Sequence, residues 1–356
     1  MVSERKPYRL SQIETAAGSA GKDARAWAKT IAAYNQPSNL RGTFEFAVSL
    51  LPFALLWAAM AVLLSHGYWL GLIFAVPAAG FLVRLFMIQH DCGHGAFFRN
   101  SHANEWVGRT VGIMTLTPYS VWKHTHALHH AGSGCLDHRG FGEIATLTVE
   151  EYKALSPWKR FKYRFYRHPL VLFGIGPAFV FILDHRLPTG MMRRGWQPWI
   201  STMGTNAALA ALTAALIWLV GWKVFLLIQL PITLIAATAG VWLFFVQHQF
   251  EETSWERLPE WQRQHAALHG SSHYDLPQPL RWFTGNIGVH HVHHLSARIP
   301  FYRLGRVLRD HPELRDINRM TLLDSLKTIP LALWDETQQR MISFGEYRRS
   351  RMAAAA

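Results

Sequence analysis

Three short segments of the sequence place histidines at intervals that suit a metal site. "HDCGH" contains His90 and His94, "HALHH" contains His126, His129 and His130, and "HHVHH" contains His290, His293 and His294. On a helix, residues three or four positions apart lie on one face. Each segment can therefore offer two or three ring nitrogens toward a common point, and imidazole nitrogen binds iron, zinc, copper and nickel alike.

A ninth histidine, His248 in "FFVQHQFEE", stands where a long apolar segment turns polar. Nine imidazoles are too many for one ion, because zinc takes about four ligands and iron about five or six. We therefore expect a centre with two metal ions. Iron is favoured over zinc because a site that faces an apolar substrate has C–H bonds to oxidise and zinc has no redox chemistry, while copper stays open.

Long apolar segments must position these histidines. Four runs, at about 44–64, 68–89, 199–220 and 224–246, each have roughly the 20 residues that a helix needs to cross a bilayer. The short links "SHG" and "GWK" join the runs in pairs, which predicts two helical hairpins.

Two weaker apolar stretches, from Val107 to Tyr119 and from Pro169 to Leu183, are too short or too interrupted to span a membrane. We expect both to be helices at the membrane interface. Arg84 lies within the second long run, near its end, where its side chain is expected to reach the interface or point inward.

Composition agrees with a membrane-embedded chain, since half of the residues are apolar and only 17% are charged. A net charge of +13 suits either nucleic acid or anionic lipid, and the long apolar runs favour lipid. Lys223 is the single lysine in the hairpin links, so the positive-inside rule places both termini and all histidine segments on the cytoplasmic side of the inner membrane. Cys92 and Cys135 match no zinc motif and are expected to be reduced thiols.

Longer segments around the histidines resemble the membrane fatty acid desaturases. These segments are "HDCGHGAFF", "THALHHAGSGCLDHRG", "WLFFVQHQFEETSWE" and "GNIGVHHVHHLSARIPFYRL". The flanking text is most similar to the bacterial and cyanobacterial acyl-lipid group that includes omega-6 (Delta-12) enzymes, and the resemblance runs from about Tyr34 to about Pro330.

The resemblance implies an all-α integral membrane protein. Its four transmembrane helices would form two hairpins, with interfacial helices and a cytoplasmic helical cap that carries a di-iron site. Residues 1–43 would be a cytoplasmic tail, 44–330 the desaturase domain and 331–356 a C-terminal tail.

The resemblance also implies the ligands and the reaction. The nine ligands of the two irons would be His90, His94, His126, His129, His130, His248, His290, His293 and His294. With O2 as co-substrate, the centre would remove two hydrogens from adjacent methylenes of a membrane-lipid acyl chain and leave a cis double bond. No catalytic residue apart from the metal ligands is implied.

Other polar residues near the histidine segments are not expected to bind metal. His124 and His291 fall outside the family spacing and are expected beside the ligands or at the surface, whereas His269 and His273 depart from the family pattern. Four polar residues lie near enough in sequence to orient the histidine rings by hydrogen bonds: Asp91, Asp137, Asp275 and Asn286. The alternative for each of them is a hydrogen bond at the protein surface.

Electrons must come from a separate protein, since no haem-attachment or iron–sulfur motif occurs in the sequence. A ferredoxin-like or cytochrome b5-like donor is implied. The basic residues that would dock an acidic donor or hold lipid phosphates include Lys123, Arg139, Arg281, Arg298 and Arg303, although positive-inside bias alone explains much of this charge.

Two other functions use similar features. A hydroxylase or ketolase of lipids, alkanes or carotenoids would share the histidine pattern and differ in its product. A non-enzymatic metal-binding membrane protein would need polar residues along a path through the apolar runs, where Arg84 is almost the only one.

Overall fold

The computed structural model describes residues 24–140, 142–258 and 260–355. Residues 1–23 of the expected N-terminal tail lie outside the described residues. The rest of that tail is folded, because residues 24–31 are helical and continue into η1 (Ala32–Tyr34). Ala24 and Ile31 are buried, and the ring of Trp27 packs edge-on against His311, so this part belongs to the cap.

Four helices are long and apolar enough to cross a membrane, as predicted, and they form two hairpins. They are α2 (Asn39–Ser65), η2 (Trp69–Phe74) continuing into α3 (Ala75–Gly93), α9 (Trp196–Val220) and α10 (Trp222–His248). Gly221 joins α9 directly to α10 with φ of 81°, a left-handed conformation that other residues rarely adopt. Large apolar side chains such as Leu55, Val62 and Trp218 are exposed on the outer faces, where lipid would cover them.

The two weaker apolar stretches differ from the prediction of two simple interfacial helices. Residues 107–119 are divided between α4 (Ser101–Met114) and α5 (Tyr119–Gly132), because Leu116 has φ of 57° and Pro118 precedes α5. Residues 171–186 are helical, with π-helical turns, and together with α7 (Pro157–Tyr166) they form a pair bent by 57° that is apolar enough to be a broken fifth span.

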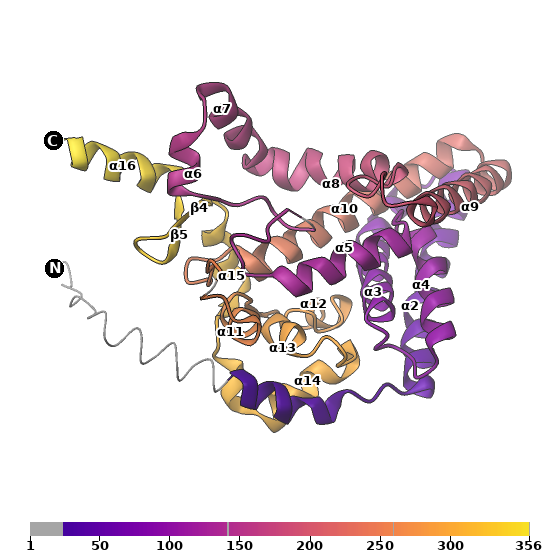
Figure 1. Ribbon diagram of the computed structural model, residues 1–356. Coiled ribbons are helices and arrows are strands. Elements are labelled where there is room, and N and C mark those ends of the chain that lie inside the picture. The colour runs from indigo at the N-terminus through magenta and orange to yellow at the C-terminus, as the bar shows by residue number, and fades with distance from the viewer. Residues whose placement is uncertain (1–23, 141, 259, 356) are drawn as a thin grey trace.

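The remaining elements form a cap at one end of the long helices (Figure 1). Its helices are α6 (Val149–Ala154), α11 (Arg263–His269), α12 (Leu280–Phe283), α13 (His290–Leu295), α14 (Phe301–Asp310), α15 (Leu322–Ser325) and α16 (Phe344–Ala355). The short helical segments of the cap are η6 (Pro312–Arg315) and η7 (Leu326–Thr328). Residues 171–186, made up of η3 (Val171–Ile175), α8 (Gly176–Ala178), η4 (Phe179–Leu183) and η5 (Asp184–Arg186), instead lie against α10 and α9.

Two small sheets complete the cap, which the sequence led us to expect as helical throughout. β1 (Leu147–Thr148) runs parallel to β4 (Leu331–Asp335), which pairs antiparallel with β5 (Arg340–Ser343). β2 (His273–Asp275) runs parallel to β3 (Arg319–Thr321). The C-terminal segment 331–356, expected as a tail, therefore contributes two paired strands and a helix, and Trp334 and Met341 are buried within it.

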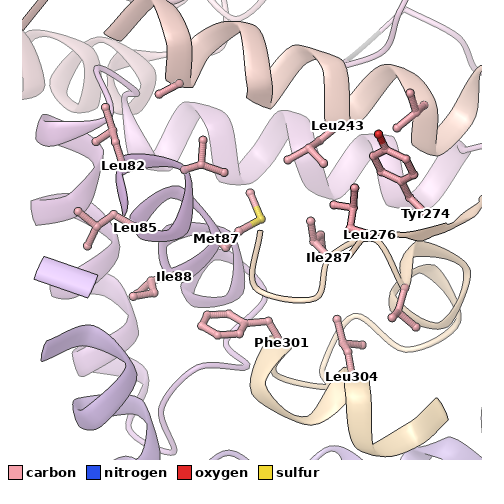
Figure 2. Packing of buried hydrophobic residues seen from close by; sticks show 14 of the residues in the cluster. Leu82, Leu85, Met87, Ile88, Leu243, Tyr274, Leu276, Ile287, Phe301 and Leu304 are labelled. Atoms are coloured by element: carbon pink, nitrogen blue, oxygen red, sulfur yellow. The ribbon is translucent and has the colours of Figure 1, made fainter. Parts of the chain in front are cut away.

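A continuous apolar core joins the cap to the long helices. In Figure 2, Met87 of α3 lies toward Ile287 and Phe301 of the cap, while Leu82 and Leu85 of the same cluster lie on the other side of α3. Arg84 lies inside this region with 2% of its surface exposed, where it pairs with Glu45 of α2 and donates to the carbonyl oxygen of Trp282. Arg84 thus points inward, and it ties both spans of the first hairpin to α12.

Candidate metal centre

All nine predicted histidines meet at the junction of the long helices and the cap. They come from the end of α3 (His90 and its C-cap His94), from α5 (His126, His129 and His130), from the last residue of α10 (His248) and from α13 (His290, His293 and His294). His94 and His126 are partly exposed and the other seven are buried. Residues as far apart in the chain as His90 and His294 are thereby brought together.

The histidines form two groups rather than one convergent set for each segment. His90, His94, His126, His130 and His293 make up the five-histidine group, and His129, His248, His290 and His294 make up the four-histidine group. Within each group the ring nitrogens lie within 4.8 Å of one another. Each segment therefore offers two ring nitrogens to one group, as expected, and each HxxHH segment gives its third histidine to the other group.

The spacing of the Nε2 atoms fits a bound cation in each group. In the five-histidine group, Nε2 of His126 is 3.1 Å from Nε2 of both His94 and His130. In the four-histidine group, Nε2 of His248 is 3.2 Å from that of His129 and 3.0 Å from that of His290. A neutral imidazole has one nitrogen with an unshared electron pair, and such pairs converging at this distance are stabilised by a metal ion.

Burial keeps these rings in the neutral form that a metal requires. Loss of solvation lowers the pKa of His129 to about 3. The same burial, together with the neighbouring imidazoles, holds the pKa of His126, His130 and His293 well below the ordinary value. Protons therefore do not compete with a metal for these nitrogens at neutral pH.

Three protein groups contact the Nδ1 atoms on the outer side of the rings. Asp91 Oδ1 lies 3.0 Å from Nδ1 of His90, and the other oxygen of Asp91 accepts a hydrogen bond from the backbone N–H of Phe301. The carbonyl oxygen of Gly270 is 3.2 Å from Nδ1 of His248. Glu143 Oε1 is 3.8 Å from Nδ1 of His129, and burial raises the pKa of Glu143 to about 8.

A family model described as "Fatty acid desaturase" matches residues 67–321, which include every one of these histidines. The chain belongs to the fatty acid desaturase family. A Bacillus subtilis protein described as "Fatty acid desaturase" is 43% identical over 316 residues, which cover 89% of each chain.

More distant relatives of this desaturase carry more specific names. A Synechocystis "sn-1 acyl-lipid omega-3 desaturase (ferredoxin)" is 28% identical over 233 residues, which cover 62% of each chain. A Brassica napus "Omega-6 fatty acid desaturase, chloroplastic" is 26% identical over 295 residues, covering 79% of this chain and 58% of the relative. With the four apolar helices, these relatives identify the protein as an integral membrane oxidoreductase that acts on fatty acyl chains.

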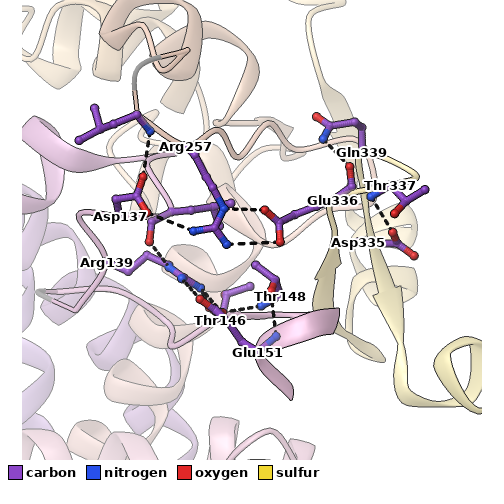
Figure 3. Close-up of polar contacts among 12 residues, drawn as sticks. Asp137, Arg139, Thr146, Thr148, Glu151, Arg257, Asp335, Glu336, Thr337 and Gln339 are labelled. Carbon is purple, nitrogen blue, oxygen red and sulfur yellow. Dashed lines mark hydrogen bonds and ion pairs between the residues drawn. The ribbon is translucent and has the colours of Figure 1, made fainter. Parts of the chain in front are cut away.

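Three of the residues expected to orient the histidine rings of the desaturase have other partners. Asp137 binds Arg257 and the backbone N–H of Leu258, as Figure 3 shows for Arg257. Asp275 pairs with Arg281 and Arg319. Asn286 donates to the carbonyl oxygen of Phe301 at 3.4 Å. Of the four candidates, only Asp91 contacts a histidine of the two groups.

Glu143 and the carbonyl of Gly270 were missed from the sequence. Glu143 lies in a loop without periodic pattern, so no spacing relates it to His129. A backbone carbonyl has no signature in sequence at all.

The remaining histidines lie apart from the metal groups. His291 is buried and donates to the carbonyl oxygen of Leu314 at 2.9 Å, so it is a core residue and not a surface one. His273 contacts the carbonyl oxygen of Arg315, His124 lies 3.2 Å from Arg194, and His269 packs against the ring of His265.

Two aromatic side chains cover the metal groups of the desaturase. Trp122 stacks on His126 with ring centroids 4.6 Å apart, and Phe244 lies 5.1 Å from His129. Gly93 permits the first contact, because a Cβ at that position would lie 2.9 Å from the indole of Trp122. The rings limit the access of water to the histidines.

Proposed function

We propose that this desaturase introduces a cis double bond into the acyl chain of a membrane lipid, using two iron ions held by the nine histidines and O2 as co-substrate. The observation that carries the proposal is the pair of adjacent histidine groups, whose Nε2 atoms converge at 3.0–3.2 Å. The five-histidine group would hold one ion and the four-histidine group the other.

Iron is favoured by this geometry as well as by its chemistry. Nitrogens about 2.1 Å from one ion lie about 3.0 Å apart when they meet it at right angles, and about 3.4 Å apart in a tetrahedron. The neighbouring Nε2 atoms are separated by 3.0–3.2 Å, which suits a five- or six-coordinate ion better than tetrahedral zinc. Measurement of iron, copper and zinc in the purified protein decides among them.

The bound irons would supply the redox chemistry, in which O2 takes two hydrogens from adjacent methylenes, two electrons from a donor and two protons from solvent, and leaves as two molecules of water. The protein's own residues hold and orient the histidine rings. Asp91 and the carbonyl of Gly270 would each receive an Nδ1–H and so direct Nε2 toward the metal. Glu143 lies 3.8 Å from Nδ1 of His129, beyond hydrogen-bond distance. Trp122 and Phe244 would keep water from the reacting methylenes.

The histidine end of the long helices is proposed to face the cytoplasm. His90 and His248 end the second and fourth spans, so both hairpins present the same end to the cap. The links between paired spans lie at the opposite end and carry little charge, while the cap is rich in arginine. The positive-inside rule supports a cytoplasmic cap and termini.

For the position of the double bond, we propose a Delta-12 (omega-6-like) product. Support comes from the Brassica napus relative named for omega-6 desaturation and from a Synechocystis relative named "sn-1 oleoyl-lipid 12-desaturase", which is 26% identical. The name of the Bacillus subtilis relative, which is 43% identical, specifies no double-bond position. Product analysis therefore tests the position separately from the desaturase activity.

A separate ferredoxin-like or cytochrome b5-like donor is proposed to deliver the electrons. The Synechocystis relative named for ferredoxin supports this class of donor. Of the basic residues expected to dock it, Lys123, Arg139 and Arg281 are already paired with carboxylates. Arg298 and Arg303 form no ion pair within the described part of the chain, so they are the better candidates for docking.

Expression in a host with saturated and monounsaturated lipids tests the proposal. Gas chromatography with mass spectrometry should show a new cis double bond, twelve carbons from the carboxyl end, that depends on O2. Variants His129→Ala and His293→Ala should remain in the membrane and produce none. A hydroxylated product without an alkene would instead identify a hydroxylase, and a double bond elsewhere would refute the Delta-12 position alone.

A further inference from the structure

α7, α6 and α16 lie close together at the end of the cap (Figure 1). A groove of about 620 Å³ is lined by residues of all three helices. The residues that matter for its chemistry are Arg160, Phe161 and Arg164 of α7 and Tyr347, Arg348 and Arg351 of α16. Four guanidinium groups thus share one groove, and no aspartate or glutamate lines it. The groove belongs to neither histidine group.

The charges of this groove are largely unneutralised. Arg348 and Arg351 form no hydrogen bond or ion pair within residues 24–140, 142–258 and 260–355. Arg164 donates to the hydroxyl of Tyr152 at 2.6 Å and Arg160 donates to the carbonyl oxygen of Lys153, so both keep their full charge. Four positive side chains without a carboxylate repel one another unless an anion binds among them.

A buried hydroxyl in the groove also lacks a partner. Tyr347 is 5% exposed and packs edge-on against Tyr152, yet its Oη makes no hydrogen bond to the described residues. Nε of Arg160 is likewise buried without a partner. Buried polar groups are nearly always hydrogen-bonded, so these two donors point to a ligand that accepts hydrogen bonds.

The rim of the groove is aromatic and exposed. Trp158, Phe161 and Phe165 follow one face of α7 and are 61%, 55% and 58% exposed. The next helical segment, residues 171–186, continues from α7 after a bend of 57° and is apolar enough to enter a membrane. Aromatic and basic side chains mixed on one short helix are typical of the headgroup region of a bilayer.

We propose that this groove binds the phosphate of an anionic phospholipid headgroup at the cytoplasmic membrane surface. The phosphate would lie among Arg160, Arg164, Arg348 and Arg351 and accept a hydrogen bond from Tyr347, while Trp158 and Phe161 contact the adjoining acyl and glycerol groups. The bound lipid would hold α7 and the C-terminal helix against the bilayer. This inference does not depend on the reaction at the histidines.

Native mass spectrometry of the full-length protein in detergent, titrated with dioleoyl phosphatidylglycerol or dioleoyl phosphatidylcholine, tests the groove. We expect phosphatidylglycerol to bind at least about tenfold more tightly. The double variant Arg348→Gln/Arg351→Gln should weaken the binding of phosphatidylglycerol by about tenfold to thirtyfold, because each arginine near an anionic lipid raises the affinity by about fivefold. Lys29→Gln/Arg349→Gln removes the same charge from exposed positions outside the groove and should change binding less than about twofold.

Tyr347→Phe separates a ligand contact from a structural role. Because Tyr347 Oη has no partner among the described residues, its removal should leave the melting temperature in neutral detergent unchanged while weakening phosphatidylglycerol binding about threefold to tenfold. Equal binding by all variants would refute the proposal. Inorganic phosphate that displaced phosphatidylglycerol at millimolar concentration would refute a lipid site and indicate a free-anion site.

Discussion

Gly288 sets the distance between the third histidine segment and β2, and its replacement by alanine should release metal. A Cβ on Gly288 would lie 2.2 Å from the carbonyl oxygen of Tyr274. Ordinary carbon–oxygen contacts are about 3.3 Å or longer, so the two backbones must separate by about 1 Å.

Neither backbone segment can move freely to make this room. Tyr274 N–H donates to the carbonyl of Gly288 at 2.7 Å, and β2 is paired with β3. The Tyr274 side chain is buried and bonded to Trp242 and Ser325. The displacement therefore falls on α13, which begins two residues after Gly288 with His290.

A displacement of about 1 Å exceeds the tolerance of a metal site, in which ligand distances hold to about 0.2 Å. We expect Gly288→Ala to cost about 1–3 kcal/mol of stability from overpacking. Metal content measured by atomic emission should fall well below that of the unmodified protein, and the yield of unsaturated product should fall with it.

Gly305→Ala provides the matched control. A Cβ there would lie 3.6 Å from Asn286, an ordinary contact, and Gly305 is within α14, where alanine is favoured. This variant should keep its metal and melt at the same or a higher temperature. If Gly288→Ala retained full metal and turnover, the close approach of β2 to α13 would not position the histidines.

Further substitutions test three other parts of the structure: the third histidine segment, the ion pair of Glu151 and the buried pair of Arg84 and Glu45. His293→Ala should remove a metal and abolish turnover, whereas His291→Ala should cost about 1–3 kcal/mol of stability and keep the metal content, as atomic emission and thermal melting would show. Burial alone would raise the pKa of Glu151, but the hydrogen bonds from Arg139 (Figure 3) outweigh the effect of burial and lower the pKa of Glu151 below 4.5. The ionised Glu151 therefore stabilises the fold above pH 4.5, and this stabilisation is lost as the pH falls. Glu151→Gln should lower the melting temperature at neutral pH, and in acid the variant and the unmodified protein should melt at similar temperatures. Arg84→Met should destabilise the first hairpin by about 3–5 kcal/mol in detergent melts by leaving Glu45 buried with less charge compensation, and adding Glu45→Gln should recover much of that loss.

The spans and the nine histidines could be predicted because both depend on local pattern. Four apolar runs of the right length predicted α2, α3, α9 and α10, and histidine spacing indicated eight members of the two groups. His248 has no histidine partner in its own segment, so it was indicated by its place at the end of an apolar run and by the family resemblance. The C-terminal segment was misread because β4 is held by β1, a strand of two residues that no periodicity reveals. Trp334 and Met341 are core residues only through that long-range pairing.

The division of the histidines between two groups follows from helix geometry. Successive residues turn by about 100°, so in HxxHH the first and last histidines lie about 40° apart while the middle one lies about 60° to the other side of the first. His126 and His130 accordingly join the five-histidine group and His129 the other. His290 and His294 join the four-histidine group and His293 the other. Each helix therefore gives a pair to one group and a single histidine to its neighbour, so α5 and α13 bridge both groups, and the distance between the two sets of nitrogens depends on how these two helices face each other.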